Sequence, residues 1–259
     1  MSSHLPLAVI GVGHLAGFLV RGLRRGGFSG EIHLSPRNKE KASKLKETCR
    51  CRIAHSNQDA AAAANTILLA TRPAVVQEVL SELSFTPEQL VISVAAGVPA
   101  DELAPFAAPA ELVTAMPISA AERCESPTLL YPDNARAKTL LQVLGAVIPV
   151  DSAEAFAAAS VNSALYGWIF ALMGELEAKN TELGLPENVA HKVVTGMFRA
   201  ASGVAEELPP GGIVPFIAGL ATPGGITEEG LIALNEKGAL KAWEDTLEKV
   251  AGRLMKARS

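Results

Sequence analysis

The stretch that decides the fold is Leu7-Ala-Val-Ile-Gly-Val-Gly-His-Leu-Ala16, close to the start of the chain. Its first four residues are apolar and predict a β-strand, and the rest opens an amphipathic helix that continues to Leu23. Gly11 permits the tight turn from strand to helix, and Gly13 lets the backbone approach a pyrophosphate, which the helix N-terminus attracts. In this context the G-x-G-x-x-A sequence predicts a dinucleotide site. The residues expected to form it are Gly11, Gly13, His14, Leu15 and Ala16.

Short apolar runs alternate with helical stretches through the first half of the chain. Further strands are predicted at residues 31–34, 66–70, 91–95, 112–115 and 129–131, and a charged helix at 39–48. Continuous apolar strands are typical of a parallel sheet buried on both faces. After about Asp151 the strand signals stop, and long helical patterns cover 153–182, 187–208 and 240–256. We predict an α/β fold with an N-terminal Rossmann-type doubly wound parallel sheet, residues 1–151, and a C-terminal all-helical domain, residues 152–259.

The composition is that of a folded protein. The 259 residues are 49% hydrophobic and 19% charged, which excludes general disorder. The net charge of -4 argues against a nucleic-acid partner, which would need a basic face. Three cysteines are too few for a disulfide framework, and neither they nor the histidines have metal-site spacing. We expect a soluble cytoplasmic protein without a metal site and without a convincing targeting segment.

One segment, residues 155–174, contains no charged residue and is long enough to span a bilayer. It carries Ser160, Asn162 and Ser163, and no basic cluster flanks it. A helix buried in a protein interface is therefore the favoured interpretation, with a membrane span as the alternative, and we expect no membrane partner.

The end of the second predicted strand indicates which dinucleotide binds. An NAD site places Asp or Glu there for the ribose 2′-hydroxyl, but this chain has Ser35-Pro-Arg-Asn-Lys39. A hydroxyl, an amide and a guanidinium suit a 2′-phosphate, so NADP (as NADPH) is the predicted cofactor. The residues expected to bind it here are Ser35, Arg37 and Asn38. The alternative is an ordinary polar loop with solvated charges.

With these residues placed, the chain resembles the pyrroline-5-carboxylate reductase family, which makes proline from a cyclic imine with NAD(P)H. The segments that carry the resemblance, besides residues 10–16, are Ile67-Leu-Leu-Ala-Thr-Arg-Pro73 (Ala-Val-Lys-Pro in the family), Ile92-Ser-Val-Ala-Ala-Gly97, Met116-Pro117, Leu183-Gly-Leu-Pro186 and Thr222-Pro-Gly-Gly-Ile-Thr227 (Ser-Pro-Gly-Gly-Thr-Thr in the family). The strand ends among them predict cofactor contacts at Ala70, Thr71, Arg72, Pro73, Ala95, Ala96, Gly97, Met116 and Pro117.

The resemblance implies that the helical domain dimerises by interleaving its helices with those of a partner, which would hide residues 155–174 in a homodimer or larger homo-oligomer. It also implies that backbone N–H groups of Gly224, Gly225 and Ile226 bind the substrate carboxylate, and that Thr227 contacts the substrate near the imine. Glycines let successive amides converge on an anion. The alternative is a helix N-cap at Thr227 with Glu228 or Glu229 in the first turn, and both can hold.

Two segments depart from the family. Met116-Pro-Ile-Ser-Ala120 stands where the family has Met-Pro-Asn-Thr-Pro, and Ile118 cannot form the hydrogen bond of that Asn at the nicotinamide end. Ser163-Ala-Leu-Tyr-Gly-Trp168 replaces Gly-Ser-Gly-Pro-Ala-Tyr. There Tyr166 is a candidate proton donor and Ser163 a candidate substrate contact, with an ordinary helix tyrosine and an ordinary helix-face serine as the alternatives.

The sequence therefore predicts an oxidoreductase that transfers hydride from NADPH to the C=N of a small cyclic imino acid, with pyrroline-5-carboxylate to L-proline as the favoured reaction. Its catalytic candidates are Thr227 and Tyr166. Because hydride transfer to a protonated imine needs orientation more than a strong acid, the missing catalytic Lys, His or Cys is no objection. The alternatives are a reductase of the same fold acting on another imine or oxo acid, and a non-catalytic sensor of NADPH or a metabolite.

Overall fold

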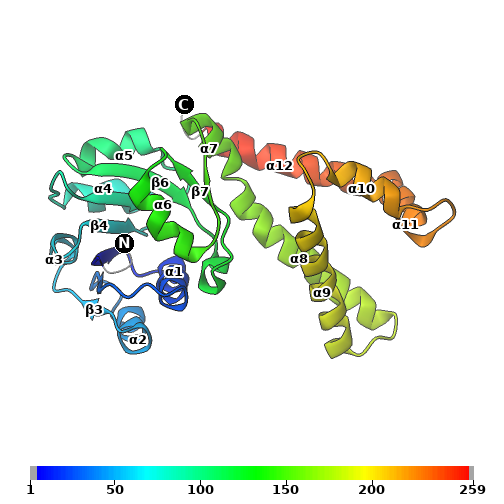
Figure 1. Ribbon diagram of the computed structural model, residues 1–259, viewed down its shortest axis with the longest axis horizontal. Helices are drawn as coiled ribbons and strands as arrows, with labels where there is room; N and C mark the ends of the chain where they lie inside the picture. The colour runs from blue at the N-terminus through cyan, green and yellow to red at the C-terminus, as the bar shows by residue number, and fades with distance from the viewer. Residues whose placement is uncertain (1–4, 257–259) are drawn as a thin grey trace. The chain divides into compact units, whose positions relative to one another are not determined.

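The computed structural model of this protein describes residues 5–256 (Figure 1). Contacts within this range divide the chain into two compact units. The first contains the residues up to Ser163 together with those from Ala251 onward, and the second is Ala164–Val250. The sequence pattern predicts a boundary between two functional domains after residue 151, and this boundary stays a prediction.

The first unit is built on one sheet, which has eight strands within the described residues. They are β1 (Leu7–Ile10), β2 (Ile32–Leu34), β3 (Arg52–Ile53), β4 (Thr66–Leu69), β5 (Leu90–Ser93), β6 (Glu111–Met116), β7 (Thr128–Tyr131) and β8 (Val147–Pro149), in the order β3-β2-β1-β4-β5-β6-β7-β8. The chain builds outward from β1 to β3 and then crosses back to place β4 beside β1. All neighbours are parallel except β6 and β7. The doubly wound sheet is confirmed, and its antiparallel strand β7 is a detail that the sequence analysis did not anticipate.

Helices cover both faces of this sheet because its central strands alternate their side chains between two apolar clusters. Leu7 and Val9 of β1 pack with α1 (His14–Arg25), α2 (Lys39–Cys49) and α6 (Ala135–Leu141). Ala8 and Ile10 pack on the opposite side with α3 (Asn57–Ala62), α4 (Val76–Ser81) and α5 (Ala100–Ala107). The strands are therefore buried on both faces, as their continuous apolar runs predict. Three short 3₁₀ helices, η1 (Pro73–Val75), η2 (Ser119–Arg123) and η3 (Gln142–Leu144), complete the connections.

The second unit is helical, as predicted. Its helices are α8 (Asn162–Glu182), α9 (Glu187–Glu207), α10 (Ile213–Leu220), α11 (Ile226–Glu236) and α12 (Ala239–Lys256), and the ends of α8 and α12 belong to the first unit. Many of its large apolar side chains face outward in the single chain: Phe170 is 56% exposed, Met197 67% and Val214 75%. By length and composition alone, the helical stretch Ala153–Glu182 is apolar enough to cross a membrane, and 11% of its most apolar window is buried.

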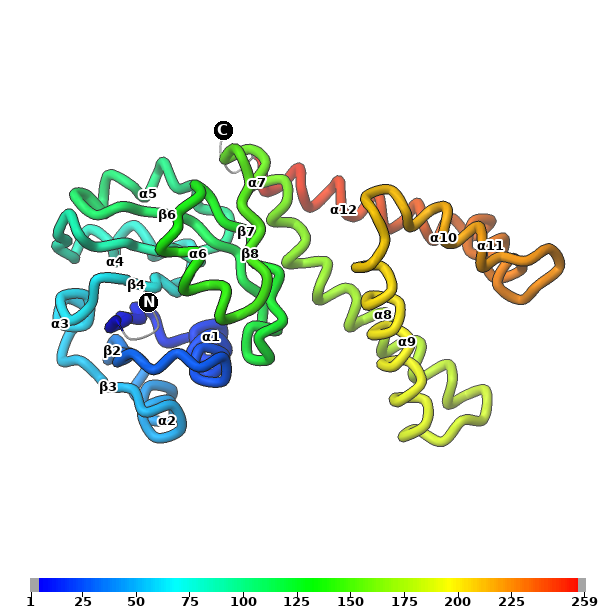
Figure 2. The backbone as a smooth tube through the Cα atoms, viewed as in Figure 1, coloured from blue at the N-terminus to red at the C-terminus, as the bar shows by residue number. Residues whose placement is uncertain are grey.

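The helical pattern predicted over 153–182 is present, but a turn at residues 160–161 divides it into α7 (Ala153–Ala159) and α8. Side chains around the turn bond to the backbone and compete with the helical pattern. The Ser160 hydroxyl donates to the Phe156 carbonyl at 2.6 Å, and the Asn162 amide donates to the Ala159 carbonyl at 2.8 Å. The tube trace in Figure 2 shows the end of α12 returning beside α7, where Leu254 lines a small cavity with Phe156.

Candidate functional site

The carboxyl ends of five parallel strands, β2, β1, β4, β5 and β6, lie along one edge of the sheet. The segments that follow these strands hold the predicted cofactor contacts: residues 11–16, 35–38, 70–73, 95–97 and 116–117. Because the chain reverses its direction of growth between β1 and β4, a crevice for a ligand is expected at this point of the edge. The topology therefore brings together segments as far apart in sequence as residues 11–16 and residues 116–117.

The two glycines of the first loop are needed for different reasons. Gly11 has a φ of +93°, and a Cβ there would lie 2.7 Å from the Ala70 carbonyl oxygen, so the fold itself requires glycine. Gly13 has a φ of -92°, which any residue adopts, and a Cβ there would meet no described atom within 4 Å. The chain leaves open space at Gly13, the residue before α1, where free N–H groups attract an anion. A pyrophosphate fits this position.

Ser35 holds the loop after β1 in place through its side chain. Its hydroxyl accepts a hydrogen bond of 2.9 Å from the N–H of Gly11, and its side chain is buried, so the end of β2 holds the turn after β1 in place. Asn38 is likewise engaged, because its side-chain oxygen caps α2 by accepting from the Lys41 N–H at 3.3 Å. Arg37 is exposed between them. Of the three residues predicted to bind a 2′-phosphate, Arg37 is the one with an exposed cationic side chain.

Thr71 follows β4 on the same edge. Its hydroxyl oxygen is buried and has no hydrogen-bond partner anywhere in the described part of the chain. A buried hydroxyl without a partner is costly, so an unpaired one at this edge is a sign that a polar ligand belongs here. Together with the open space over Gly13, this residue indicates that the edge fits a dinucleotide.

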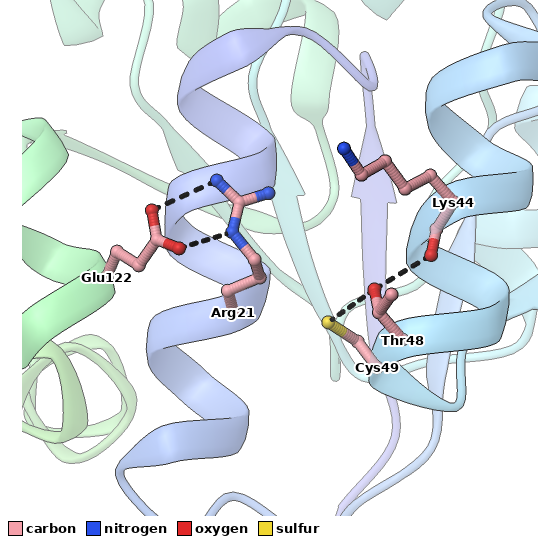
Figure 3. A network of polar contacts seen from close by, with 5 residues as sticks. All are labelled: Arg21, Lys44, Thr48, Cys49 and Glu122. Atoms are coloured by element: carbon pink, nitrogen blue, oxygen red, sulfur yellow. Dashed lines mark hydrogen bonds and ion pairs between the residues drawn. The ribbon is translucent and has the colours of Figure 1, made fainter.

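The segment after β6 is anchored to α1. Arg21 of α1 makes a two-pronged ion pair with Glu122 of η2, at 2.6 and 3.0 Å (Figure 3). The hydrogen bond and charge of this pair raise the pKa of Arg21 and lower that of Glu122. Gly22 allows the close approach, because a Cβ there would lie 2.0 Å from the Ala121 carbonyl oxygen. Since η2 follows Ile118 directly, this contact fixes the backbone at the first departure from the family.

A hollow of about 300 Å³ opens between α1 and α2 beside the first loop. Its lining includes Gly13, His14, Lys41 and Lys44. Figure 3 shows the Lys44 side chain extending from α2 toward α1. His14 is exposed there, so the hollow places cationic and titratable groups next to the residues expected to hold phosphates.

The Pro-Gly-Gly loop of the second unit leads into α11. Gly224 has a φ of +73°, and its N–H donates to a carboxylate oxygen of Glu228 at 2.8 Å. Gly225 is the residue that caps α11, and Thr227 lies exposed one residue inside the helix. The alternative in which Thr227 caps the helix is therefore wrong, whereas Glu228 does lie in the first turn. This contact between Glu228 and the loop is one that the sequence analysis missed.

The cysteines take no part in this site. Cys49 and Cys51 are buried, and burial raises the pKa of the Cys51 thiol to about 12. Among residues 5–256, no group of three or more His, Cys, Asp or Glu side chains could hold a metal ion.

Comparison with known proteins shows what the chain is similar to. A family model described as NADP oxidoreductase coenzyme F420-dependent matches residues 6–97, and one described as pyrroline-5-carboxylate reductase dimerisation matches residues 153–256. A pyrroline-5-carboxylate reductase of Pseudomonas aeruginosa is 26% identical over 261 residues, covering 95% of this chain and 94% of the relative. The chain is therefore similar to pyrroline-5-carboxylate reductases along nearly its whole length, and its residues 153–256 match the dimerisation model of that family.

Solved structures agree on the fold. A pyrroline-5-carboxylate reductase from Streptococcus pyogenes superposes with a TM-score of 0.84 at 24% identity, over 98% of this chain and 100% of that chain. A pyrroline carboxylate reductase from Plasmodium falciparum, solved with NADP bound, has a TM-score of 0.84 at 16% identity and covers 99% of each chain.

Two candidate site residues lie at the second segment that departs from the pattern of pyrroline-5-carboxylate reductases. The Ser163 hydroxyl donates to the Ser160 carbonyl at 2.8 Å, so it is engaged in the turn before α8. The Tyr166 ring is half-buried and packs edge-on against Phe170, with ring centroids 5.0 Å apart. Both contacts are those of ordinary helix residues, and a substrate role for either side chain stays a prediction.

Proposed function

We propose that this chain reduces a cyclic imino acid with NADPH, and that its reaction is pyrroline-5-carboxylate to L-proline. One observation carries the proposal: the chain is similar along nearly its whole length to pyrroline-5-carboxylate reductases, with the dinucleotide loop and the Pro-Gly-Gly loop both present. The open space over Gly13 and the unpaired hydroxyl of Thr71 support a dinucleotide at the sheet edge.

In this proposal the N–H groups around Gly13 and the start of α1 bind the pyrophosphate. Arg37 binds the 2′-phosphate, which favours NADPH over NADH, while Ser35 and Asn38 hold the surrounding backbone. The NADP bound in the Plasmodium falciparum structure supports a nicotinamide cofactor. The remaining contacts are proposed at His14, Leu15, Ala16, Ala70, Thr71, Arg72, Pro73, Ala95, Ala96, Gly97, Met116 and Pro117.

The chain's task in catalysis is to bind and orient the substrate. Bound NADPH supplies a hydride, which adds to the carbon of a protonated C=N and leaves a cyclic amine. Backbone N–H groups of Gly224, Gly225 and Ile226 bind the substrate carboxylate, which displaces the present partners of the first two, a Glu228 carboxylate oxygen and the Thr222 carbonyl. Thr227 contacts the substrate near the nitrogen, and Tyr166 and Ser163 are further candidates there. Orientation and exclusion of water provide most of the acceleration that such a step needs.

The apolar surface of the second unit supports a homo-oligomer. Exposed side chains such as Phe170, Met197 and Val214 would be costly to leave in water, and the dimerisation match spans all of them. We propose that a second copy covers these helices in a homodimer or larger assembly, which accounts for the apolar stretch Ala153–Glu182 without a membrane. A cytoplasmic location fits this assembly.

A reductase of the same fold with a different imine or oxo acid as substrate is the second candidate. The observation that favours it is the pair of departures, Ile118 and the segment from Ser163 to Trp168, at positions that the family uses for the nicotinamide end and the imine.

The test mixes purified protein with NADPH and pyrroline-5-carboxylate, follows NADPH oxidation by absorbance, and analyses the product for proline. Gly13→Val is the control, because it is expected to fold and to bind no cofactor. Turnover with proline formed supports the proposal. NADPH binding without turnover on this substrate, but with turnover on another imine, supports the second candidate. NADPH binding without turnover on any imine indicates a sensor.

A further inference from the structure

Thr71 has a side chain that the fold does not explain. Its hydroxyl oxygen is buried and unpaired, and it is the one buried side-chain nitrogen or oxygen among residues 5–256 in this condition. Elsewhere the buried polar side chains of this unit are satisfied: Ser35 bonds to Gly11, and Gln89 bonds to two carbonyls at 2.8 and 2.9 Å. Because the other buried polar side chains are paired, the unpaired hydroxyl of Thr71 calls for an explanation.

Packing is not that reason. Thr71 stands where the family's Ala-Val-Lys-Pro motif has valine, a side chain of nearly the same shape that needs no partner. Valine would fill this space without the cost of the lone hydroxyl. The hydroxyl is therefore a feature in which this chain differs from the family motif, and it lowers the stability of the protein without cofactor.

The position of Thr71 connects it to the dinucleotide loop. Its backbone nitrogen lies 2.8 Å from where a Cβ of Gly11 would stand, and the neighbouring Ala70 N–H donates to the Ile10 carbonyl at 2.7 Å. The ends of β1 and β4 are thus locked together, and Thr71 adjoins the turn that approaches the pyrophosphate. The residue as a whole is partly exposed although its hydroxyl oxygen is not. Staggered rotamers of threonine differ by about 120° in χ1, so the hydroxyl can change position without a change in the backbone.

We propose that Thr71 is a cofactor-sensing residue: when NADPH binds, its hydroxyl turns out of its buried position and hydrogen-bonds to an oxygen of the dinucleotide, a phosphate oxygen or a ribose hydroxyl. This inference rests on the proposed NADPH site. The cost of the unpaired hydroxyl is carried by the free protein and relieved in the complex, so it adds to the binding free energy. Thr71 thereby couples the stability of the free chain to its affinity for the cofactor.

Two variants test this inference in the full-length protein, without any assay of turnover. Thr71→Val removes the hydroxyl and keeps the shape, whereas Thr71→Ser keeps the hydroxyl and removes the methyl group. The NADPH dissociation constant is measured by fluorescence titration, and the melting temperature is measured without cofactor. For Thr71→Val we expect affinity to fall about tenfold and the free protein to melt higher than the wild type, whereas Thr71→Ser stays within about threefold of wild-type affinity.

The opposite changes in affinity and stability distinguish sensing from a structural role, which would lower both. Thr71→Val with wild-type affinity, or with a lower melting temperature, would overturn the inference while leaving the NADPH site standing. A wild-type protein that binds no NADPH would overturn the proposed function as well. Titration with 2′-phospho-ADP and with nicotinamide mononucleotide then shows which half of the cofactor carries the oxygen, because the Thr71→Val defect persists only for that half. A defect on neither half counts against the bond.

Discussion

Replacing Gly13 with valine separates the cofactor role of the first loop from its role in the fold. Gly13 has φ -92° and ψ -165°, an extended conformation that valine adopts readily, and a Cβ there would meet no described atom within 4 Å. Losing glycine before a helix costs on the order of 1 kcal/mol, and the stiffer unfolded chain returns about 0.4–1 kcal/mol. The free energy of unfolding should therefore change by less than about 1 kcal/mol, and the melting temperature by no more than about 4 °C.

Cofactor binding should respond very differently. The valine side chain would fill the space that the pyrophosphate needs in order to reach the N–H groups of α1. Hydrogen bonds to a charged group contribute about 1.5–3 kcal/mol each, so losing two of them weakens binding by about 3–6 kcal/mol. That loss corresponds to a dissociation constant at least 100-fold higher, for NADPH and NADH alike.

Gly11→Ala is the matched contrast within the same loop. At φ +93°, with the Cβ 2.7 Å from the Ala70 carbonyl oxygen, alanine brings backbone strain of about 1–3 kcal/mol and overpacking of a similar size. Its melting temperature should fall on the order of 10 °C. Thermal melts and fluorescence titrations of both variants make the assay. Normal NADPH binding by Gly13→Val, or a melting temperature as low as that of Gly11→Ala, would refute the reasoning.

Three further predictions address single side chains. Arg37→Ala should weaken NADPH binding about tenfold and leave NADH binding nearly unchanged, and equal effects in titrations with the two cofactors would contradict a 2′-phosphate contact. Thr227→Ala should lower turnover at least tenfold with NADPH affinity unchanged; a parallel loss of both would indicate misfolding. Because Arg21 lowers the pKa of the Glu122 carboxyl below its ordinary value of 4.5, their pair stabilises the fold above that pH and is lost as pH falls through the lowered pKa. Glu122→Gln should therefore lower the free energy of unfolding by at most about 1 kcal/mol at pH 7, since both side chains are about one-third exposed. Thermal melts should show that the difference between the variant and the wild type vanishes in acid. A difference that persists at low pH would argue against the ion pair.

Sequence periodicity predicted the parts of the fold that long apolar patterns specify. The central strands and the first helix were predicted because burial on both faces leaves an unbroken apolar run, as in Leu7–Ile10. Strand β3 has two residues, too few for a pattern, and two of the three residues of β8 are exposed, so β8 lacks the buried apolar run of the central strands. Helix α10 was missed, and α11 was predicted only as an alternative and only at its N-terminus, because the segments around both helices are rich in proline and glycine.

The polar detail of the site depended on contacts between distant residues. Arg21 and Glu122 lie 101 positions apart, so nothing local in the sequence indicates their pairing. Ser35 was predicted from its residue type to bind phosphate, but its hydroxyl accepts from Gly11, 24 positions away. The unpaired state of the Thr71 hydroxyl is seen only in the three-dimensional structure. Gly11, in contrast, could be predicted directly, because the backbone geometry at that position requires glycine, whereas Gly13 was predicted from its place in the G-x-G-x-x-A motif.

The end of α12 belongs to the first unit, so the second unit is an insertion between two segments of the first. Its polypeptide leaves after Ser163 and comes back at Ala251, where Leu254 lines a cavity with Gly97 and Phe156. A single protease cut within residues 164–250 would therefore not separate the two units, and a stop codon there would remove the residues from Ala251 onward, which belong to the first unit. To produce the first unit alone, residues 164–250 are deleted and a flexible linker joins residue 163 to residue 251.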